Sequence, residues 1–560
     1  MKMLKLLTML LLLPALVSGA DITVLDGDIN AGDNVTWTAN NTYILDGLVY
    51  VEEGATLTIE AGTVIKGKET PSTGDNTSAL IITRGAQIFA EGTATQPIIF
   101  TAEVDNVANP ADLSFADRGL WGGLIILGNA SANTTTGTGQ IEGISSDEPR
   151  GTYGGGTTPD DNDNSGILRY VSVRHGGNEI GAGNEINGVS FGAVGAGTTV
   201  EYVEVMSNLD DGFEWFGGTV NTRYLVAAFC ADDGFDYDEG FRGNHQFWFV
   251  MQGPDLAGRG AEQDGGTSPE DGQPYAMPVI ANATYMGAGA GNFPQGDGAE
   301  LLIFRDNAGG KYYGSIFTDY NGGNGGVGIT VEDLASGEDS RARLEAGELV
   351  LSNNIWFGFA AGNDLALFAP QDFVQTHLTA NNNQLVDPQL TSVSREHNGM
   401  LDPRPASAGP AATGATQPAD AFFAAVDYYG AFDPGAPLWT NGWTGLFQER
   451  ISTQDMVTSV ERGVENNSTI PASFELSQNF PNPFNPSTTI NYNLPSLGKV
   501  QIAVYNMMGQ RVAIILDEVR PAGNNNITWE AALDLSTGVY LYQLRFDGKP
   551  IGIRKMTLIK

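Results

Sequence analysis

Short apolar segments separated by turns dominate the first 450 residues. Typical segments are Trp121–Leu127, Leu168–Val173, Phe247–Met251, Leu301–Phe304 and Glu348–Ile355. Gly, Asp and Asn cluster between the segments, and the segments are shorter than the roughly ten residues that a helix usually needs. This pattern predicts many short β-strands joined by turns.

Two patterns recur at almost the same spacing. Leu57–Ile65 aligns with the later segment Leu80–Ile88. The acidic sequence of Asp210–Glu214 returns at Asp232–Asp236. The step is 23 residues in the first pair and 22 in the second. This length suits one coil of a parallel β-helix, in which coils stack about 4.8 Å apart and bury their faces on each other. A propeller blade needs about 40–45 residues, and an antiparallel sandwich array gives no reason for the acidic sequence to recur at this spacing.

Four longer segments interrupt the predicted coils: 101–118, 131–166, 253–275 and 360–450. The last contains two aromatic runs, Val426–Phe432 and Leu438–Trp443. Because a solenoid exposes unpaired strand edges at its open end, we expect 360–450 to cap that end. The alternative is that Trp439 and Trp443 form a platform for stacking a sugar ring. The predicted β-helix body spans 21–450.

The N-terminus has the pattern of a cleaved secretory signal. Lys2 and Lys5 precede the apolar run Leu6–Val17, and small residues follow at Ser18–Ala20. This arrangement predicts a signal peptide over residues 1–20, because the apolar run is short for a membrane span of about 20 residues. We therefore expect a secreted protein with no transmembrane segment in its mature form.

The C-terminal residues 473–560 form a second predicted domain, with eight basic and six acidic side chains. Period-2 patterning and turn residues indicate a small antiparallel β-sandwich. Its strands are expected at Thr489–Leu494, Val500–Tyr505, Val539–Arg545 and Lys555–Lys560. The polar segment 451–472 is a predicted linker.

The start of this domain carries a distinctive proline-rich run. It reads Asn479, Phe480, Pro481, Asn482, Pro483, Phe484, Asn485 and Pro486. Together with Tyr505–Val512, which contains Gly509, and Ser536–Tyr540, which contains Gly538, it resembles the C-terminal sorting domain of the type IX secretion system. The resemblance implies export, recognition by the type IX secretion machinery, removal of the domain, and release or attachment to cell-surface polysaccharide.

The body resembles another group of proteins. Thr56–Gly92 and Trp121–Gly128 are similar to the opening coils of secreted right-handed parallel β-helix proteins. The whole body loosely resembles an uncharacterised group of such proteins that carry the same sorting tail. The resemblance implies an all-β, right-handed parallel β-helix followed by a sandwich, and it assigns no chemistry.

Charge and residue counts exclude several function classes. The chain has 28 Lys and Arg against 66 Asp and Glu, a net charge of −38. Nucleic acid binding requires a basic surface, so we expect no nucleic acid partner. The single Cys230 excludes an internal disulfide framework, and four histidines leave little for histidine-based chemistry.

The strongest candidate site is the repeated acidic sequence. If the repeat spans one coil, Asp210, Asp211 and Glu214 stack over the next coil's acids, Asp232, Asp233 and Asp236. Carboxylates about 5 Å apart repel one another, so they are expected to hold protons or a cation. Oxygen-rich surroundings suit Ca²⁺, the one cofactor that we predict. The alternative is that these residues only form turns, with carboxylates that accept backbone N–H groups.

A second calcium candidate lies in the segment 131–166. Asp161, Asp163 and Ser165, followed by Gly166, match the first half of an EF-type loop. The twelfth position is Ser172 and not Glu, so the bidentate ligand is missing. The alternative is a solvated turn.

Signals for catalysis are weak, and we name no catalytic residue. Arg174 and Arg242 are the conceivable bases of a lyase, but neither lies in a lyase motif. We therefore expect a binding or structural module at the cell surface, with extracellular glycan as a candidate partner. The alternative is a calcium-dependent polysaccharide lyase or another glycan-degrading enzyme of the β-helix class.

Overall fold

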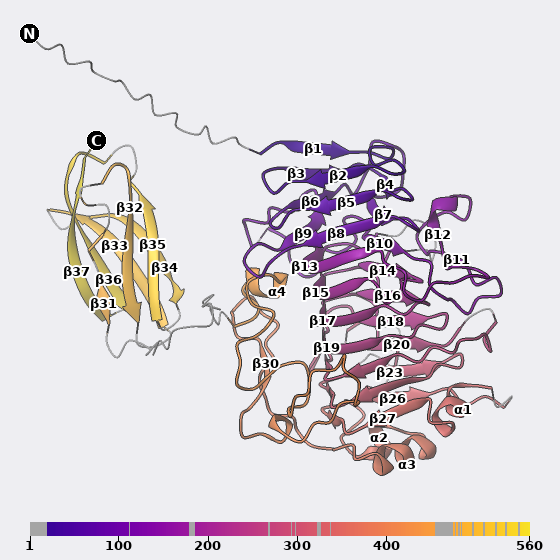
Figure 1. Cartoon of the computed structure of the whole chain (residues 1–560). Helices are drawn as coiled ribbons and strands as arrows, with labels where there is room; N and C mark the ends of the chain where they lie inside the picture. The colour runs from indigo at the N-terminus through magenta and orange to yellow at the C-terminus, as the bar shows by residue number, and fades with distance from the viewer. Residues whose placement is uncertain are drawn as a thin grey trace, which may run out of the picture. The chain divides into compact units, whose positions relative to one another are not determined.

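The computed structural model describes residues 19–453 and 474–559, with short gaps. The gaps are 111, 179–184, 267–268, 290, 293, 297, 322–325, 336–337, 477, 480–481, 483, 495–497, 508–509, 521–522, 532–534 and 547–548. The apolar part of the expected signal peptide and residues 454–472 of the expected linker lie outside the described residues. The chain divides into two compact units at residue 458 (Figure 1). Ile451 and Ser452, at the start of the expected linker, are instead buried in the first unit, where Ser452 pairs with Leu401.

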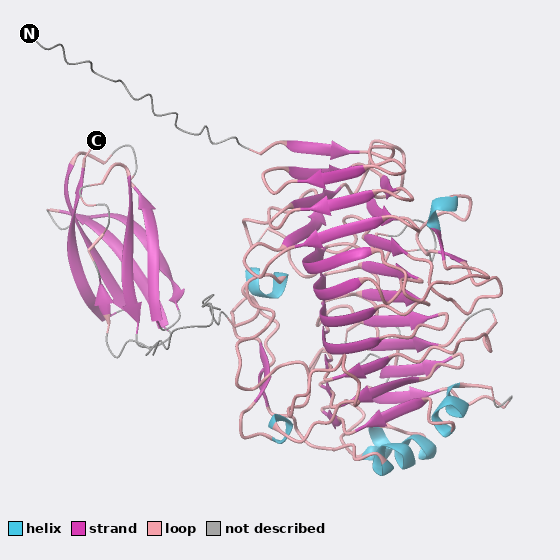
Figure 2. Ribbon diagram, in the orientation of Figure 1, coloured by secondary structure: helices cyan, strands magenta, loops and turns pink. Residues whose placement is uncertain are grey.

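The first unit is a parallel β-helix with three faces, seen as stacked strands in Figure 2. The first face contains β2 (Asn34–Trp37), β5 (Thr56–Ile59), β8 (Gln87–Glu91), β21 (Val279–Ala281), β24 (Gly310–Tyr313) and β27 (Leu349–Ser352). The second face contains β1 (Asp21–Val24), β3 (Thr42–Leu45), β6 (Val64–Gly67), β9 (Ile98–Ala102), β22 (Thr284–Met286), β25 (Ile316–Thr318) and β28 (Ile355–Phe357).

Four longer strands bend and belong to both of these faces. They are β13 (Gly166–Arg174), β15 (Thr199–Met206), β17 (Asn221–Ala228) and β19 (Asn244–Met251). The third face contains β4 (Leu48–Val51), β7 (Ala79–Ile82), β10 (Leu124–Leu127), β14 (Val189–Gly192), β16 (Phe213–Phe216), β18 (Phe235–Asp238), β20 (Ala261–Asp264), β23 (Glu300–Arg305) and β26 (Val327–Val331).

The remaining elements of this unit are short and lie outside the three faces. They are β11 (Gly139–Gln140), η1 (Pro149–Gly151), β12 (Thr152–Tyr153), α1 (Ser340–Glu345), α2 (Leu365–Phe368), α3 (Asp372–Ala380), β29 (Leu390–Ser392), β30 (Asp402–Pro405), η2 (Pro410–Ala412) and α4 (Gly445–Gln448). Among the described residues, no helix is long and apolar enough to cross a membrane.

The strand register confirms the predicted coil length in the middle of the helix. Thr199 pairs with Asn221 and Phe213 pairs with Phe235, both at the spacing of the acidic repeat. The predicted alignment of Leu57 with Leu80 is wrong, because Leu57 pairs with Ile88 and lies on a different face from Leu80. Extra residues between β6 and β7 lengthen this coil and bring similar apolar sequences onto different faces.

The expected insertion 253–275 also needs correction. It contains β20, a strand of the third face that pairs with β18 and β23. The sequence of β20 is Ala-Glu-Gln-Asp, so it lacks the apolar pattern that predicts the other strands. The insertion 131–166 contains the short antiparallel pair β11–β12 and ends at β13.

Alternate side chains of each strand fill the interior of the helix. On β16 and β18 the inward residues include Phe213, Trp215 and Phe235, all nearly inaccessible to solvent. Their rings stack between coils, with centroids 5.5 Å apart for Phe213 and Phe235. The residues between them, Glu214 and Asp236, therefore point to the outer side of the third face.

An aromatic ladder runs along the bends between the first and second faces. Tyr170, Tyr202, Tyr224 and Phe247 each have positive φ angles between 51° and 63°. Consecutive rings stack with centroids 4.5, 4.3 and 4.9 Å apart. The bend conformation is uncommon for side chains of this size, and the stacked rings offset its cost with favourable contacts.

The aromatic runs of the C-terminal segment do not cap the open end, contrary to our expectation. The ring of Trp443 is fully buried and meets Tyr170 and Tyr202 edge-on, with centroids 5.8 and 6.3 Å apart. Trp439 meets Tyr224 at 5.3 Å. The segment covers the aromatic ladder and the apolar outer side of the second face, while α2 and α3 lie against the last coils (Figure 1). Trp443 is therefore inaccessible to a sugar ring.

The second unit is an antiparallel β-sandwich of two sheets around one apolar core. One sheet contains β31 (Glu475–Leu476), β32 (Ser487–Leu494) and β35 (Gly523–Glu530). The other contains β33 (Gly498–Asn506), β34 (Arg511–Arg520), β36 (Gly538–Phe546) and β37 (Lys549–Leu558).

The described part of the proline-rich run is tied to this sandwich. The backbone N–H of Asn479 donates to the Tyr542 hydroxyl at 2.9 Å, and its Nδ2 donates to Thr488 Oγ1 at 2.9 Å. The Phe484 N–H donates to the Thr557 carbonyl at 3.0 Å, and the Phe484 ring is buried. Phe480, Pro481, Pro483 and Gly509 lie outside the described residues.

Truncation of Trp443 tests the covering role of the C-terminal segment. We expect Trp443→Ala to destabilise the β-helix by about 3–5 kcal/mol, because it removes a buried ring from the aromatic ladder. The measurement is the unfolding transition in guanidinium chloride. Leu385→Ala is the control, since this side chain is 45% exposed. A Trp443→Ala protein as stable as the control contradicts the covering role.

Candidate functional site

A row of carboxylates lies on the outer side of the third face. The register pairs Glu214 with Asp236 and Asp236 with Glu262, so three acidic side chains occupy equivalent positions in successive coils. We call this row, with the acids in the preceding turns, the acid ladder. Its members are Asp210, Asp211, Glu214, Asp232, Asp233, Asp236 and Glu262.

Five of the six predicted ligands of the repeated sequence form two groups of three. The carboxylate oxygens of Asp210, Asp211 and Asp232 lie within 4.8 Å of one another, and so do those of Asp211, Glu214 and Asp236. The sixth, Asp233, belongs to neither group and contacts Arg259 instead. Its carboxylate accepts a hydrogen bond from the Arg259 backbone N–H and lies 3.7 Å from a guanidinium nitrogen. Asp211 belongs to both groups.

Two residues that were not predicted complete the surroundings of Glu214. Asn187, which precedes β14, donates from Nδ2 to Glu214 Oε2. Glu142, which follows β11 in the insertion 131–166, lies close enough to Glu214 for its charge to raise the pKa of that carboxyl. Asn187 occupies the coil position equivalent to Asp211, since Val189 pairs with Phe213, but its coil differs in length from the repeat. Glu142 comes from the insertion, so no sequence spacing relates it to the repeat.

Burial and crowding raise the pKa values of these acids. Burial and the nearby charges of Glu185, Glu142 and Asp232 raise the pKa of Asp210 to about 8. The pKa values of Asp211, Glu214 and Asp236 also lie well above the ordinary range, first because of burial and then because of neighbouring carboxylates. The ladder therefore needs protons or cations to compensate its charge.

Two arginines neutralise the far end of the ladder. Arg259 lies 3.3 Å from Glu262 and 3.0 Å from Glu300. Arg305 lies 2.7 Å from both Glu262 and Asp264. Burial alone would lower the pKa of Arg305, but the hydrogen bond and charge of Asp264 outweigh it and raise the pKa above its ordinary value.

The second predicted calcium loop has other partners within the chain. Asp161 accepts from the N–H and hydroxyl of Ser131, at 2.9 and 2.6 Å, and pairs with Arg242 at 3.1 Å. Asp163 accepts from Asn129 Nδ2 at 3.3 Å and from Ser165 Oγ at 3.4 Å. The carboxylates of Asp161 and Asp163 thus bind different partners, and these hydrogen bonds hold the loop against neighbouring parts of the chain.

The two conceivable lyase bases are also engaged elsewhere. Arg174 is 3% exposed and donates to Ser172 Oγ at 2.8 Å and to Gln448 Oε1 at 2.7 Å, beneath the segment that contains α4. Arg242 is held by Asp161 and Ser131. A third acidic group, formed by Glu270, Asp306 and Glu332, was not predicted because its members come from unrelated segments.

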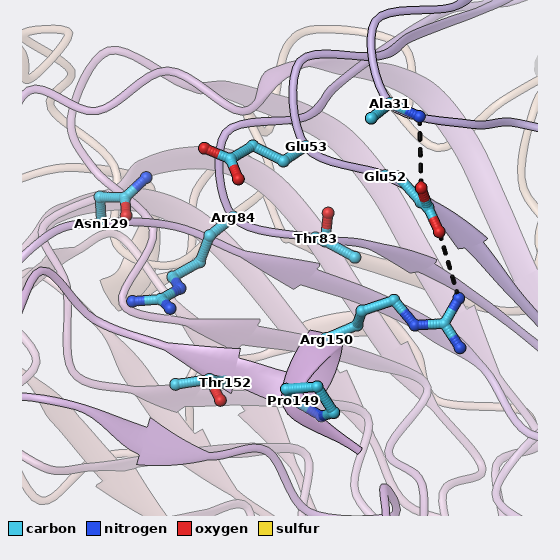
Figure 3. A pocket seen from close by; sticks show the side chains of 9 residues that line it. All are labelled: Ala31, Glu52, Glu53, Thr83, Arg84, Asn129, Pro149, Arg150 and Thr152. Carbon is cyan, nitrogen blue, oxygen red and sulfur yellow. Dashed lines mark hydrogen bonds and ion pairs between the residues drawn. The ribbon is translucent and has the colours of Figure 1, made fainter.

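A polar cleft of about 550 Å³ lies between the first coils and the insertion 131–166 (Figure 3). Its lining residues are Ala31, Glu52, Glu53, Thr83, Arg84, Asn129, Pro149, Arg150 and Thr152. Arg150 forms ion pairs with Asp26 at 2.9 Å, Glu52 at 3.5 Å and Glu148 at 2.7 Å. Its guanidinium also lies over the ring of Tyr50. Arg84 donates to the Gly154 carbonyl at 2.7 Å and forms no ion pair within the described part of the chain.

Comparison with known proteins identifies both units. The model of the pectate-lyase-like β-helix domain matches residues 27–402, and the model of the secretion system C-terminal sorting domain matches residues 478–558. No curated protein matches the chain.

Among solved structures, tailspike protein 2 of the Escherichia coli O157:H7 bacteriophage CAB120 is similar, at 11% identity and a TM-score of 0.28. The similarity covers 94% of this chain and 64% of the tailspike chain, so this chain spans less than two thirds of that protein.

The link between Glu239 and the insertion makes stability depend on pH. Burial raises the pKa of Glu239 to about 7, although the Tyr153 hydroxyl donates to its carboxylate. A raised carboxyl pKa favours the folded state at low pH, and this contribution is lost as pH rises from about 4.5 through about 7. Glu239→Gln removes that loss, so we expect the variant to exceed the wild type in stability at pH 8 by roughly 2 kcal/mol and to match it at pH 4.

The check is the free energy of unfolding of both proteins across this pH range. Glu69→Gln is the control, because Glu69 is exposed. If Glu239→Gln retains the wild-type pH dependence, Glu239 is ionised in the folded protein and the expectation fails.

Proposed function

Because the chain belongs to the family of pectate-lyase-like β-helix domains and ends in a sorting domain, we propose that it binds neutral glycan at the cell surface without cleaving it. The sorting domain directs the protein through the type IX machinery to the cell surface or the extracellular space. The proposal places the glycan in the cleft of Figure 3.

The chemistry of the cleft lining is the observation that carries the proposal. Arg84 and Asn129 offer N–H donors, Glu53 offers acceptors, and Thr83 and Thr152 offer hydroxyls that do both. Sugar hydroxyl groups also donate and accept, so a lining of this mixture satisfies them from several sides. The volume of about 550 Å³ lies within the range of pockets for small ligands.

The charge of the cleft favours a neutral ligand over an anionic one. Arg150 is neutralised by three carboxylates, and Glu53 adds a further negative charge beside Arg84. The whole chain carries −38, so a polyuronate approaches against long-range repulsion. A neutral oligosaccharide meets no such barrier.

The arginines near the acid ladder argue against a lyase. A lyase base must give up its own proton before it can remove one from a uronate, which requires a lowered pKa. The pKa of Arg305 is instead raised by Asp264 and Glu262. Arg259 is likewise held between Glu262 and Glu300.

Calorimetric titration with neutral oligosaccharides tests the binding site. Neutral xylo- and cello-oligosaccharides are the probes, with oligogalacturonate as the anionic comparison. We expect a neutral probe to bind the wild type, and Arg84→Ala and Asn129→Ala each to weaken binding about tenfold by removing one hydrogen-bonding side chain. Arg341→Ala is the matched control, because Arg341 pairs with Asp333 and Glu345 outside the cleft. Preferential binding of oligogalacturonate, or equal affinity in all variants, refutes this site.

Incubation with pectate or alginate in the presence of Ca²⁺ tests the lyase alternative. We expect no ultraviolet absorbance from unsaturated uronate product, since no suitable base adjoins the described part of the ladder. Product that disappears in Arg305→Ala, Arg174→Ala or Arg242→Ala, with the fold intact by circular dichroism, replaces the binding proposal with an enzyme.

A further inference from the structure

The acid ladder holds more negative charge than its described neighbours compensate. Within the described part of the chain, no lysine or arginine forms an ion pair with Asp210, Asp211, Glu214 or Asp236. The insertion adds Glu142, whose nearby carboxyl raises the pKa of Glu214. Partly buried charges without an opposite charge nearby are costly, so this part of the ladder favours compensation by protons or by a cation from solution.

Two buried oxygen atoms beside the second group have no hydrogen-bond partner among the described residues. Asn187 is 1% exposed, and its amide is held beside the second group by the bond from Nδ2 to Glu214. Its Oδ1 is buried without a hydrogen-bond partner, and so is Oδ1 of Asp236. Buried oxygens of this kind are rarely left unsatisfied, and amide and carboxylate oxygens are ligands that Ca²⁺ prefers.

We propose that the acid ladder binds two calcium ions that share Asp211. Asp210, Asp211 and Asp232 hold the first ion. Asp211, Glu214 and Asp236, with Oδ1 of Asn187, hold the second. This site is separate from the polar cleft and does not depend on glycan binding.

The ligand set identifies the class of cation. All the donors are oxygens, with no His or Cys, so zinc and other metals that prefer nitrogen or sulfur are disfavoured. Ca²⁺ accepts six to eight oxygen ligands in a flexible geometry, and the oxygens of each group lie within 4.8 Å of one another. Mg²⁺ dehydrates reluctantly and is usually bound by only one or two carboxylates, so a group of three carboxylates favours Ca²⁺.

The ions have a structural role in this arrangement. The first group joins two successive turns between the second and third faces, and the second group joins β16 to β18. Asn187 draws the segment before β14 into the same site. Calcium therefore links three coils and stabilises the native state by mass action.

Calcium binding to the full chain, freed of metal with a chelator, tests the proposal. We expect calorimetric titration with CaCl₂ to show about two ions per chain and the melting temperature to rise by several degrees. Asp211→Asn should weaken both ions at least tenfold, because Asp211 belongs to both groups. An asparagine there can still accept the Asp233 N–H that Asp211 Oδ1 accepts at 2.8 Å, so the backbone contact is kept.

Asp236→Asn separates ion binding from a simple packing role. In chelator it should melt higher than the wild type, because one repelling charge is removed. It should lose about half of the bound calcium and part of the calcium-dependent rise. Glu270→Gln, at the exposed member of the third acidic group, is the matched control and should behave like the wild type.

Three results overturn the proposal. One is a wild-type melting temperature that does not respond to calcium, as expected if protons alone neutralise the ladder. Another is a stoichiometry other than two. The third is wild-type calcium affinity in both Asp211→Asn and Asp236→Asn with circular dichroism showing an intact fold.

Discussion

The parallel hydrogen bonds between successive coils hold equivalent residues of neighbouring coils about 4.8 Å apart. A residue type that recurs once per coil therefore forms a column on the outside or inside of the helix. The same rule places Tyr202 against Tyr224, with centroids 4.3 Å apart, and Glu214 against Asp236. For aromatic rings this proximity is favourable, whereas for carboxylates it is repulsive. The acidic repeat is thus tolerated only because something else compensates its charge.

The compensation differs along the ladder. At Glu262 it comes from within the chain, through Arg259 and Arg305, and Arg305 also pairs with the neighbouring Asp264. At Asp211 and Glu214 the surrounding segments supply an amide and further acids instead. A chain selected only for stability could extend the arginine pairing along the whole ladder. The two proposed calcium ions lie on the side of this change where the acids have no arginine partner among the described residues.

The covering segments decide which surfaces remain available. The insertion 131–166 packs Ile141, Ile144 and Tyr153 on the apolar outer side of the third face, and its edge forms the polar cleft. Residues near the end of the body pack Phe432, Leu438 and Leu446 on the outer side of the second face. Both segments remove apolar surface from water, which is the main driving force for their docking. A consequence is that Trp443 lies in a packed core, although the sequence also allowed an exposed, sugar-stacking role for it.

Local sequence patterns were sufficient to predict the β-helix, the sandwich and the stacking of the acidic repeat. Strand patterning depends on neighbouring residues, and a coil of constant length turns a sequence spacing into a spatial one. Where inserted residues change that length, as between Leu57 and Ile88, the spacing no longer predicts the neighbour. A polar strand such as β20 also gives no apolar signal.

Asn187 and Arg259 occupy the positions equivalent to Asp211 and Asp233 in neighbouring coils of different length, so the contacts of Asn187 with Glu214 and of Arg259 with Asp233 follow from the coil register. Only the tertiary structure brought Glu142 to Glu214. It also combined Arg84 with Asn129 and Thr152 in one cleft. These contacts join segments whose separation along the chain has no fixed period. They form because apolar side chains elsewhere in the same segments dock onto the faces of the helix. The sequence by itself thus determined the repeating core and its outward acids, and the docking of irregular segments decided which of those acids are paired, covered or open to a ligand.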